Sequence, residues 1–249
     1  MSALRNKIPQ VDTHTHTILS GHAWGTLREN VQAAAERGLK GICLTEHGPA
    51  IPGGVAEFVP AAQVLLPEVI QGVRIYKGVE LSILDAAGHL DIPDRYLSEL
   101  DFVIASNHVL AASFPDERAV TDGYCSAICD PYVDMIGHFH DIRTRSDYRK
   151  VIATCAENGK LLELNGSYMA ESRKEHWTYL RDCVQEIMRQ KARVCVSSDA
   201  HYPDHIGAVG DMMAFLDDMD FPEEQIVNLT IEGFQSYLKE RKARMEGLA

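Results

Sequence analysis

The sequence predicts an α/β protein that folds as a single barrel of parallel strands and helices. Short apolar strands alternate strictly with amphipathic helices in seven successive units, a pattern typical of a parallel sheet. The units are evenly spaced, which favours closure into a barrel over an open sheet. A length of 249 residues is normal for one such barrel, and the sequence contains no linker, repeat or low-complexity tract. We therefore expect one domain over residues 1–249.

The expected strands are short apolar runs, and most of them end in a histidine or an acidic residue. Their ranges are 11–17, 41–47, 73–80, 100–108, 132–140, 160–165 and 192–201. The helices that follow them are expected at 27–37, 58–71, 117–129, 145–158, 171–190, 206–219 and 231–244. Gly38 and Gly159 directly follow two of these helices, as is typical of helix C-termini. Pro67 predicts a break in the second helix, and residues 85–93 are expected to form a polar turn or short hairpin.

Composition and charge exclude several classes of function. The formal net charge is −12, whereas binding to long nucleic acids requires clustered Lys and Arg. Bound divalent cations would still allow an acidic protein to hold an anionic substrate. No segment has the length of a membrane span, and the N-terminus lacks the apolar core of a signal peptide. The six cysteines include no C-x-x-C pair, which favours buried reduced thiols and a cytoplasmic location.

Potential metal ligands gather at the ends of the expected strands. In a β/α barrel the chemistry lies on the loops that follow the C-terminal ends of the strands, so these side chains should line one mouth. One histidine after a strand is more often a hydrogen-bonded loop residue than a ligand. Nine donors converging on one face favour metal binding over coincidence. They are His14, His16, His22, His47, Glu80, His108, His138, Asp199 and His201.

The number of donors predicts more than one metal ion. A catalytic zinc takes about three protein ligands, so seven imidazoles and two carboxylates suit two or three ions. Three divalent ions would bring a charge of about +6 against about −2 from Glu80 and Asp199. The resulting cationic pocket suits a bridging hydroxide and a phosphate anion. Nitrogen and oxygen donors do not select sharply among Zn²⁺, Mn²⁺ and Fe²⁺.

Seven motifs, taken in order, resemble those of the PHP (polymerase and histidinol phosphatase) superfamily. They are V-D-T-H-T-H-T, L-S-G-H-A, L-T-E-H-G-P, G-V-E, S-N-H, I-G-H and S-S-D-A-H. The resemblance extends from Val11 to Phe221 and is closest to the YcdX group of small stand-alone bacterial phosphatases. It implies a distorted, TIM-like (β/α)7 barrel with a trinuclear metal centre.

The resemblance also implies how the ligands divide among the ions. The first metal would be held by His14, His16, Glu80 and Asp199. Glu80 would bridge to the second metal, which would be completed by His108 and His138. The third metal would be held by His22, His47 and His201. We expect zinc ions first, with Mn²⁺ or Fe²⁺ as alternatives. The turn I-G-H-F-H replaces the family's histidine-proline-glycine turn, which leaves open whether His140 also faces the site.

The expected reaction is hydrolysis of a small phosphorylated metabolite, a phosphomonoester, by a metal-bridging hydroxide. Glu80 and Asp199 would anchor the metals, and no protein nucleophile is required. The sequence contains no G-x-S-x-G elbow or P-loop that would offer another route. Arg173 could bind phosphate through both arms of its guanidinium group, although a solvated arginine fits the sequence equally well. Asn165 and Ser167 are weaker candidates.

Two other functions are compatible with the same donors. A phosphodiesterase or nuclease could use the same metals, and the acidity of the chain counts against long nucleic acids but not against a dinucleotide. A non-catalytic metal-binding module is disfavoured because all nine expected ligands are present, whereas loss of catalysis should have allowed some of them to change. Self-association is possible, and the sequence does not identify the substrate or the native metal. Of the remaining histidines, His89, His176 and His205 are expected at the surface, with a role as mobile proton donors as the alternative for His176 and His205.

Overall fold

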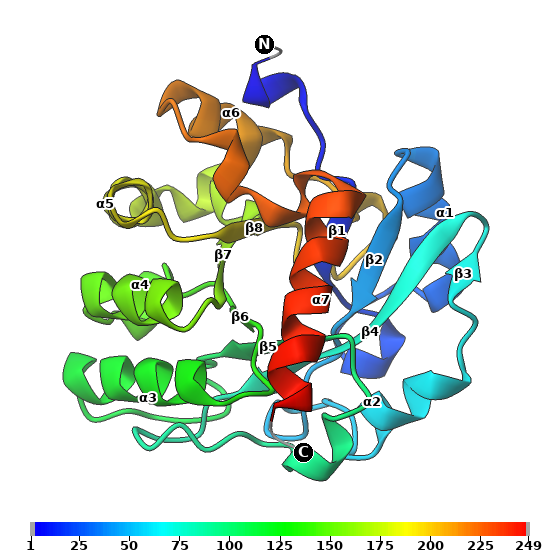
Figure 1. Ribbon diagram of the computed structural model, residues 1–249, viewed down its shortest axis with the longest axis horizontal. Coiled ribbons are helices and arrows are strands. Elements are labelled where there is room, and N and C mark those ends of the chain that lie inside the picture. Colours follow the sequence, from blue (N-terminus) through cyan, green and yellow to red (C-terminus); the bar gives the residue numbers. More distant parts are fainter. Residues whose placement is uncertain (1–2, 248–249) are drawn as a thin grey trace.

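The computed structural model describes residues 3–247 and confirms the α/β barrel (Figure 1). Seven parallel strands follow one another in chain order around the sheet. They are β1 (Val11–Thr15), β2 (Gly41–Leu44), β4 (Val73–Ser82), β5 (Phe102–Ser106), β6 (Met135–Ile136), β7 (Leu161–Asn165) and β8 (Val194–Ser197). An eighth strand, β3 (Val69–Ile70), pairs antiparallel with β4.

Helices cover the outside of this sheet. They are α1 (Leu27–Glu36), α2 (Val59–Ala62), α3 (Glu117–Cys129), α4 (Tyr148–Glu157), α5 (Trp177–Gln190), α6 (Gly210–Asp218) and α7 (Ile231–Glu246). In Figure 1, α3, α4 and α5 are stacked on one side, and α1 lies on the other. Helix α1 begins with a capping box, in which Thr26 accepts from the Glu29 N–H and the Glu29 carboxylate accepts from the Thr26 N–H.

Several expected elements differ from the structure, and backbone chemistry explains why. The helix expected over 58–71 contains only α2 and one 3-10 turn, because Pro67 lacks an N–H and restricts the residue before it. The β-branched residues that follow instead form β3. The helix expected over 171–190 begins only at Trp177, after a 3-10 segment in which Arg173 has a non-helical φ of −119°. The helix expected from residue 206 begins at Gly210, because Gly207 has φ 68°.

Side chains complete the closure of the barrel between β1 and β8. Backbone pairing there is limited to an isolated bridge, where the His16 N–H donates to the Ala200 carbonyl at 2.9 Å. Nearby, the Asn228 Nδ2 atom donates to the carbonyls of Val11 (2.8 Å) and Val196 (2.7 Å). The Asn228 Oδ1 atom accepts from the Val196 N–H at 3.0 Å. A single buried amide therefore takes the place of a missing backbone pair.

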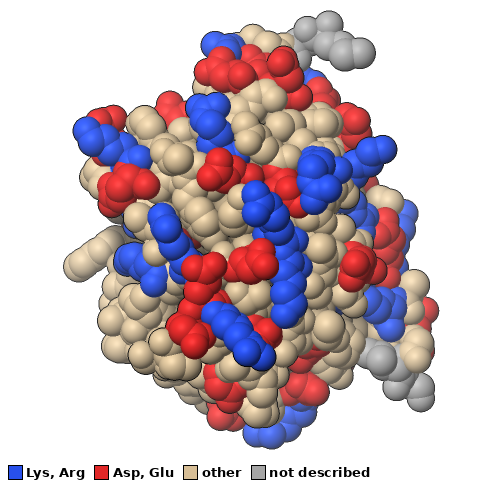
Figure 2. All heavy atoms as spheres, turned by 90° about the vertical axis from the view of Figure 1, so that its left-hand side faces the viewer, with Lys and Arg blue, Asp and Glu red and all other residues tan. Residues whose placement is uncertain are grey.

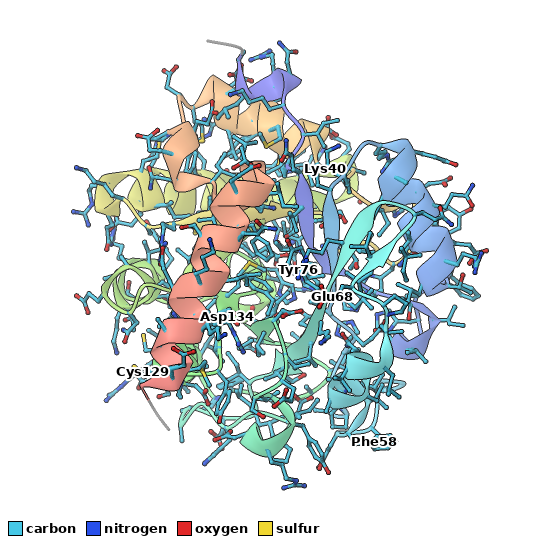
Figure 3. The ribbon with its side chains drawn as sticks, turned by 45° about the vertical axis from the view of Figure 1, so that its right-hand side comes forward. Lys40, Phe58, Glu68, Tyr76, Cys129 and Asp134 are labelled. Atoms are coloured by element: carbon cyan, nitrogen blue, oxygen red, sulfur yellow. The ribbon has the colours of Figure 1, made fainter. Side chains whose placement is uncertain are left out.

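Helix α7 closes the N-terminal end of the barrel. It runs across the centre of the ring of strands in Figure 1. The Phe234 ring lies 5.0 Å from the ring of Tyr76, and both are buried among residues from the first halves of the strands. Asp134, labelled in Figure 3, lies just before β6 and forms a buried ion pair with Arg241 of α7 at 2.7 Å. Packed side chains therefore fill this end of the barrel, and the expected ligands lie at the opposite, C-terminal ends of the strands.

The helical flank of the molecule carries both signs of charge. On the face over α3, α4 and α5, lysines and arginines alternate with acidic side chains (Figure 2). Lys150 pairs with Asp122 at 3.0 Å, and Arg189 pairs with Glu186. The six cysteines are unpaired, as expected, although Cys129 is exposed. Within residues 3–247, none of the helices combines the length and apolarity that crossing a bilayer requires. The cytoplasmic location stays a prediction.

Candidate active site

The barrel brings the nine expected ligands together at its C-terminal mouth. His14 and Glu80 lie on β1 and β4, and the others follow the strands directly or lie in the first loop. The imidazole rings form a continuous cluster, with centroids 5.0 Å apart for His14 and His16 and 4.2 Å apart for His16 and His201. His22 is the outermost, 4.6 Å from the His201 ring.

Glu80 lies at the centre of this cluster and is fully buried. Its Oε2 atom is 2.7 Å from His47 Nδ1 and 3.2 Å from His14 Nε2. Its Oε1 atom is 3.0 Å from His108 Nε2 and 3.1 Å from His138 Nε2. The two oxygens therefore face different groups of histidines, an arrangement that suits a carboxylate shared between two cations.

Two members of the cluster have strained backbones. Asp199 has φ 53° and His138 has φ 25°, values that residues other than glycine adopt at a cost of about 1–3 kcal/mol. The Asp199 Oδ1 atom lies 3.3 Å from His16 Nε2 and 3.5 Å from His14 Nε2. The strained turn after β8 thus directs a carboxylate at His14 on β1 and at His16, which directly follows β1. The strand expected over 132–140 is shorter in the structure: β6 comprises only Met135–Ile136 and ends just before the turn at His138.

Hydrogen bonds fix which ring nitrogen His14 and His16 present to the cluster. The Nδ1–H of His14 donates to Glu163 Oε1 at 2.7 Å. The Ser20 hydroxyl donates to Glu46 at 2.6 Å, so its oxygen accepts from His16 Nδ1 at 3.0 Å. Both histidines therefore carry the proton on Nδ1 and turn Nε2 toward the cluster, the arrangement that metal-binding imidazoles commonly have.

Several buried atoms of the cluster lack a hydrogen-bond partner. An unsatisfied buried polar atom costs about 1–3 kcal/mol, so a concentration of such atoms in one place requires an explanation. Divalent cations would satisfy the atoms that point into the cluster, because these are nitrogen and oxygen donors with free lone pairs. They are the Nε2 atoms of His14, His16 and His201, Nδ1 of His47 and Oε2 of Glu80; the unpartnered Nδ1 of His138 is the ring nitrogen that does not face Glu80.

The donors form three overlapping sets, each of which has the spacing that one ion requires. In every set the ligand atoms lie within 4.8 Å of one another. The sets are His14–His16–Glu80, His47–Glu80–His108 and His16–His47–His201. Because they share Glu80, His16 and His47, cations bound to them would be close neighbours.

The electrostatics of the cluster are dominated by its carboxylates. Burial acts to lower the pKa of His14, but Glu80, Glu163 and Asp199 outweigh it and raise that pKa well above its usual range. Burial acts to raise the pKa of Glu80, and the surrounding histidines, His14 first, hold it well below its usual range. Protons and cations would therefore compete for the same nitrogens.

Two buried carboxylates of the site do not stand out from the sequence. Glu163 on β7 is fully buried and bonds to His14, and Glu46 after β2 is 2% exposed and supports His16 through Ser20. Glu46 directly precedes the expected ligand His47, which conceals its separate role, and Glu163 lies inside the apolar strand β7. The available signal is an acidic residue inside an apolar strand, since an uncompensated buried charge there would be costly.

A cavity of about 180 Å³ opens beside the cluster. Its far wall is formed by Tyr168, Arg143 and Arg173. The Tyr168 hydroxyl donates to Asp141 Oδ2 at 2.7 Å, and Arg143 pairs with the same carboxylate at 2.6 Å. The Arg173 guanidinium lies 4.4 Å from the centroid of the Tyr168 ring and pairs with no carboxylate among residues 3–247. Its charge is thus available to the cavity.

The remaining histidines and Asn165, the last residue of β7, lie outside the cavity. His140 is fully buried, and its Nε2 accepts from the Asn165 N–H at 3.3 Å. Asn165 is buried too and donates to Asp199 at 3.0 Å, so it does not face the cavity. The expectation of a surface position is confirmed for His89 and His205 but is wrong for His176, which is 4% exposed. The 3-10 segment turns its ring against Tyr168, 4.9 Å away.

Comparisons with known proteins agree with this geometry. The family model for the PHP domain matches residues 12–174. A probable phosphatase of Caldanaerobacter subterraneus subsp. tengcongensis is 38% identical over 95% of this chain and 94% of its own. A probable phosphatase of Photobacterium profundum is 33% identical over 93% of this chain and 94% of its own.

Solved structures show the same fold. Histidinol phosphate phosphatase from Lactococcus lactis, in complex with zinc, L-histidinol and phosphate, has a TM-score of 0.58 at 19% identity. The match covers 86% of this chain and 95% of that one. A chain of archaeal ribonuclease P has a TM-score of 0.57 at 14% identity, over 94% of this chain and 93% of its own.

The barrel fold, the donor cluster and the related proteins together place this protein in the class of metal-dependent phosphatases, enzymes that hydrolyse phosphoric esters. The chain belongs to the PHP domain family.

Proposed function

We propose that this protein hydrolyses small phosphomonoesters at a centre of three divalent cations. The observation that carries the proposal is the set of three overlapping donor groups, in which the inward nitrogens of four histidines have no hydrogen-bond partner: His14, His16, His47 and His201. A cavity that exposes a free guanidinium group lies directly beside these donors.

The nine residues divide among the ions as the family resemblance implies. His14, His16, Glu80 and Asp199 would hold the first ion, and Glu80, His108 and His138 the second. His22, His47 and His201 would hold the third. Their clustering supports this division, with the His201 ring 4.6 Å from His22 and 5.6 Å from His47. Zinc is the ion we propose first, since a structural neighbour contains it, and Mn²⁺ or Fe²⁺ are alternatives.

Bound cations would lower the pKa of water and neutralise charge on a phosphate group. The protein's own residues supply the rest. Glu80 and Asp199 balance part of the cationic charge, and buried hydrogen bonds hold the imidazoles in one orientation. Arg173 would bind the phosphate or an acidic group of the substrate, because its guanidinium lies in the cavity wall. The cavity of about 180 Å³ favours a small metabolite as substrate.

Paired esters test this proposal. We expect hydrolysis of p-nitrophenyl phosphate, loss of that activity after chelation, and recovery with Zn²⁺ or Mn²⁺. Bis(p-nitrophenyl) phosphate should be cleaved much more slowly. Faster cleavage of the bis-ester would overturn the proposed substrate class in favour of a phosphodiesterase. If the metal-loaded protein hydrolyses neither ester, the proposed phosphomonoester hydrolysis is overturned and a non-catalytic metal-binding role is favoured.

A further inference from the structure

Strand β7 supplies none of the nine proposed ligands, yet it contacts three of them. It lies between β6 and β8 in the sheet, so its inward side chains reach the middle of the site. Two of these side chains, Glu163 and Asn165, are completely buried. Their polar atoms bond to residues of the cluster and to two neighbouring serines.

Glu163 uses both of its oxygens to hold neighbouring elements. Its Oε1 accepts from His14 Nδ1 at 2.7 Å and from the Ser197 hydroxyl at 2.5 Å. Its Oε2 accepts from the His138 N–H at 2.6 Å and from Asn165 Nδ2 at 3.3 Å. Each oxygen therefore already has two donors, and the carboxylate cannot also act as a ligand without giving some of them up. Glu163 therefore fixes the ring of His14 and the strained backbone of His138.

Asn165 extends the same hydrogen-bond network to a further proposed ligand, Asp199. Its Nδ2 group donates to Asp199 Oδ2 at 3.0 Å, which leaves Asp199 Oδ1 facing His14 and His16. Its Oδ1 accepts from the N–H and hydroxyl groups of Ser167, at 3.0 and 2.7 Å. The amide is thus held from both sides and orients a carboxylate whose residue has φ 53°.

We propose that Glu163 and Asn165 are positioning residues that set the spacing of three metal ligands: His14, His138 and Asp199. The inference rests on the proposed function, because it assumes that these three residues hold cations. Ligands from three different strands have no covalent reason to keep their spacing. The buried side chains of Glu163 and Asn165 on β7 instead fix this spacing, because they hydrogen-bond to all three ligand residues. Partners of this kind, which hold a ligand without touching the metal, typically change metal affinity about 10- to 100-fold when removed.

The test compares Glu163→Gln and Asn165→Ala with a matched control, Asp134→Asn. Asp134 is also a fully buried carboxylate, bonded to the Val103 N–H and to Arg241, but it lies at the opposite end of the barrel. Zn²⁺ affinity is measured by competition with a chromophoric chelator. The Co²⁺-substituted proteins are compared by their visible absorption, which reports ligand geometry. Thermal unfolding of the metal-free proteins measures the purely structural effect.

We expect Glu163→Gln and Asn165→Ala to lower Zn²⁺ affinity about 10- to 100-fold and to change the Co²⁺ spectrum. Asp134→Asn should lower the unfolding temperature and leave both metal readouts unchanged. Unaltered affinity and spectra in the two β7 variants would overturn the inference, and so would an equal loss of affinity in the control. If Glu163→Gln does not fold, Asn165→Ala decides the result alone. A wild-type protein that binds no Zn²⁺ or Co²⁺ would instead overturn the proposed function.

Discussion

His47 Nδ1 lies 2.7 Å from Glu80 Oε2, although the two residues come from different strands of the barrel. The backbone brings them together, because His47 and Glu80 form an isolated parallel β-bridge in which the Gly48 N–H donates to the Glu80 carbonyl at 3.0 Å. The same carboxylate is within 3.5 Å of nitrogens of four other histidines, His14, His16, His108 and His138. Glu80 is therefore the residue on which most of the proposed site converges.

Replacing this carboxylate by an amide should disable the enzyme without unfolding it. We expect Glu80→Gln to lower phosphatase activity by roughly 100-fold or more, because loss of a ligand should exceed the effect of losing an outer partner. Steady-state hydrolysis of p-nitrophenyl phosphate measures the effect. Glu68→Gln is the control, since the Glu68 side chain is 73% exposed and its carboxylate pairs with Arg74. Similar activity in the two variants would contradict the central role of Glu80.

His201→Ala should remove one ion and leave the other two. His201 is proposed to share its ion with His22 and His47, whereas the other donors lie deeper around Glu80. We expect the metal content to fall from three equivalents to two, as measured by elemental analysis of the purified proteins. His205→Ala, an exposed histidine in the same loop, should retain all three. Three equivalents in His201→Ala would show that the proposed division of ligands is wrong.

Arg173→Ala should weaken substrate binding more than it slows turnover. The guanidinium lines the cavity without a carboxylate partner, so its loss removes a charge-assisted hydrogen bond worth about 1.5–3 kcal/mol. We expect KM for a phosphomonoester to rise about 10-fold or more, and Arg173→Lys to recover part of that loss. Lys174→Ala serves as the control, since Lys174 pairs with Glu171 at the surface. An unchanged KM in Arg173→Ala would place this residue outside substrate binding.

Lys160 should make stability depend on pH in alkaline solution. Burial lowers the pKa of Lys160 from 10.5 to about 8, although its ammonium donates to the Asp130 and Val133 carbonyls. Between those values the unfolded chain binds the proton and the native protein does not, so the free energy of unfolding rises with pH. Relative to Lys160→Met, the wild type should gain on the order of 2 kcal/mol between pH 8 and pH 10. Urea denaturation at several pH values measures the difference, and a constant difference would refute the pKa assignment.

Asn228→Ala should loosen the closure of the barrel. Its amide bonds to Val11 and Val196 at the junction of β1 and β8, and truncation leaves buried backbone groups unpaired. Each such group costs about 1–3 kcal/mol, so we expect a loss of roughly 2–5 kcal/mol in the free energy of unfolding. Urea denaturation compares this variant with Asn158→Ala, in which an exposed asparagine is truncated. A loss below 1 kcal/mol would mean that Asn228 does not stabilise the junction.

The fold and the candidate ligands were predictable because both follow from local pattern. Short apolar runs, most of them ending in histidine or an acidic residue, specify a parallel barrel and place those ends at one mouth. Helix limits were less predictable where single residues override periodicity, as at Pro67, where the chain turns to form β3, and at Gly207 with its positive φ.

The supporting network of the site could not be predicted in the same way. The bond between Glu163 and His14 joins β7 to β1, and no local pattern encodes a contact across the interior of the barrel. The burial of His176 likewise depends on a 3-10 segment that periodicity reads as helix. Whether His140 faces the cavity depended on the turn at His138, whose φ of 25° only coordinates reveal.

Metal titration of the chelated protein, followed by phosphatase activity, tests the central claim most directly. The account predicts negligible hydrolysis of p-nitrophenyl phosphate by the metal-free protein, and recovery that is complete when about three equivalents of Zn²⁺ or Mn²⁺ are bound. Full activity in protein shown by elemental analysis to contain no metal would contradict it.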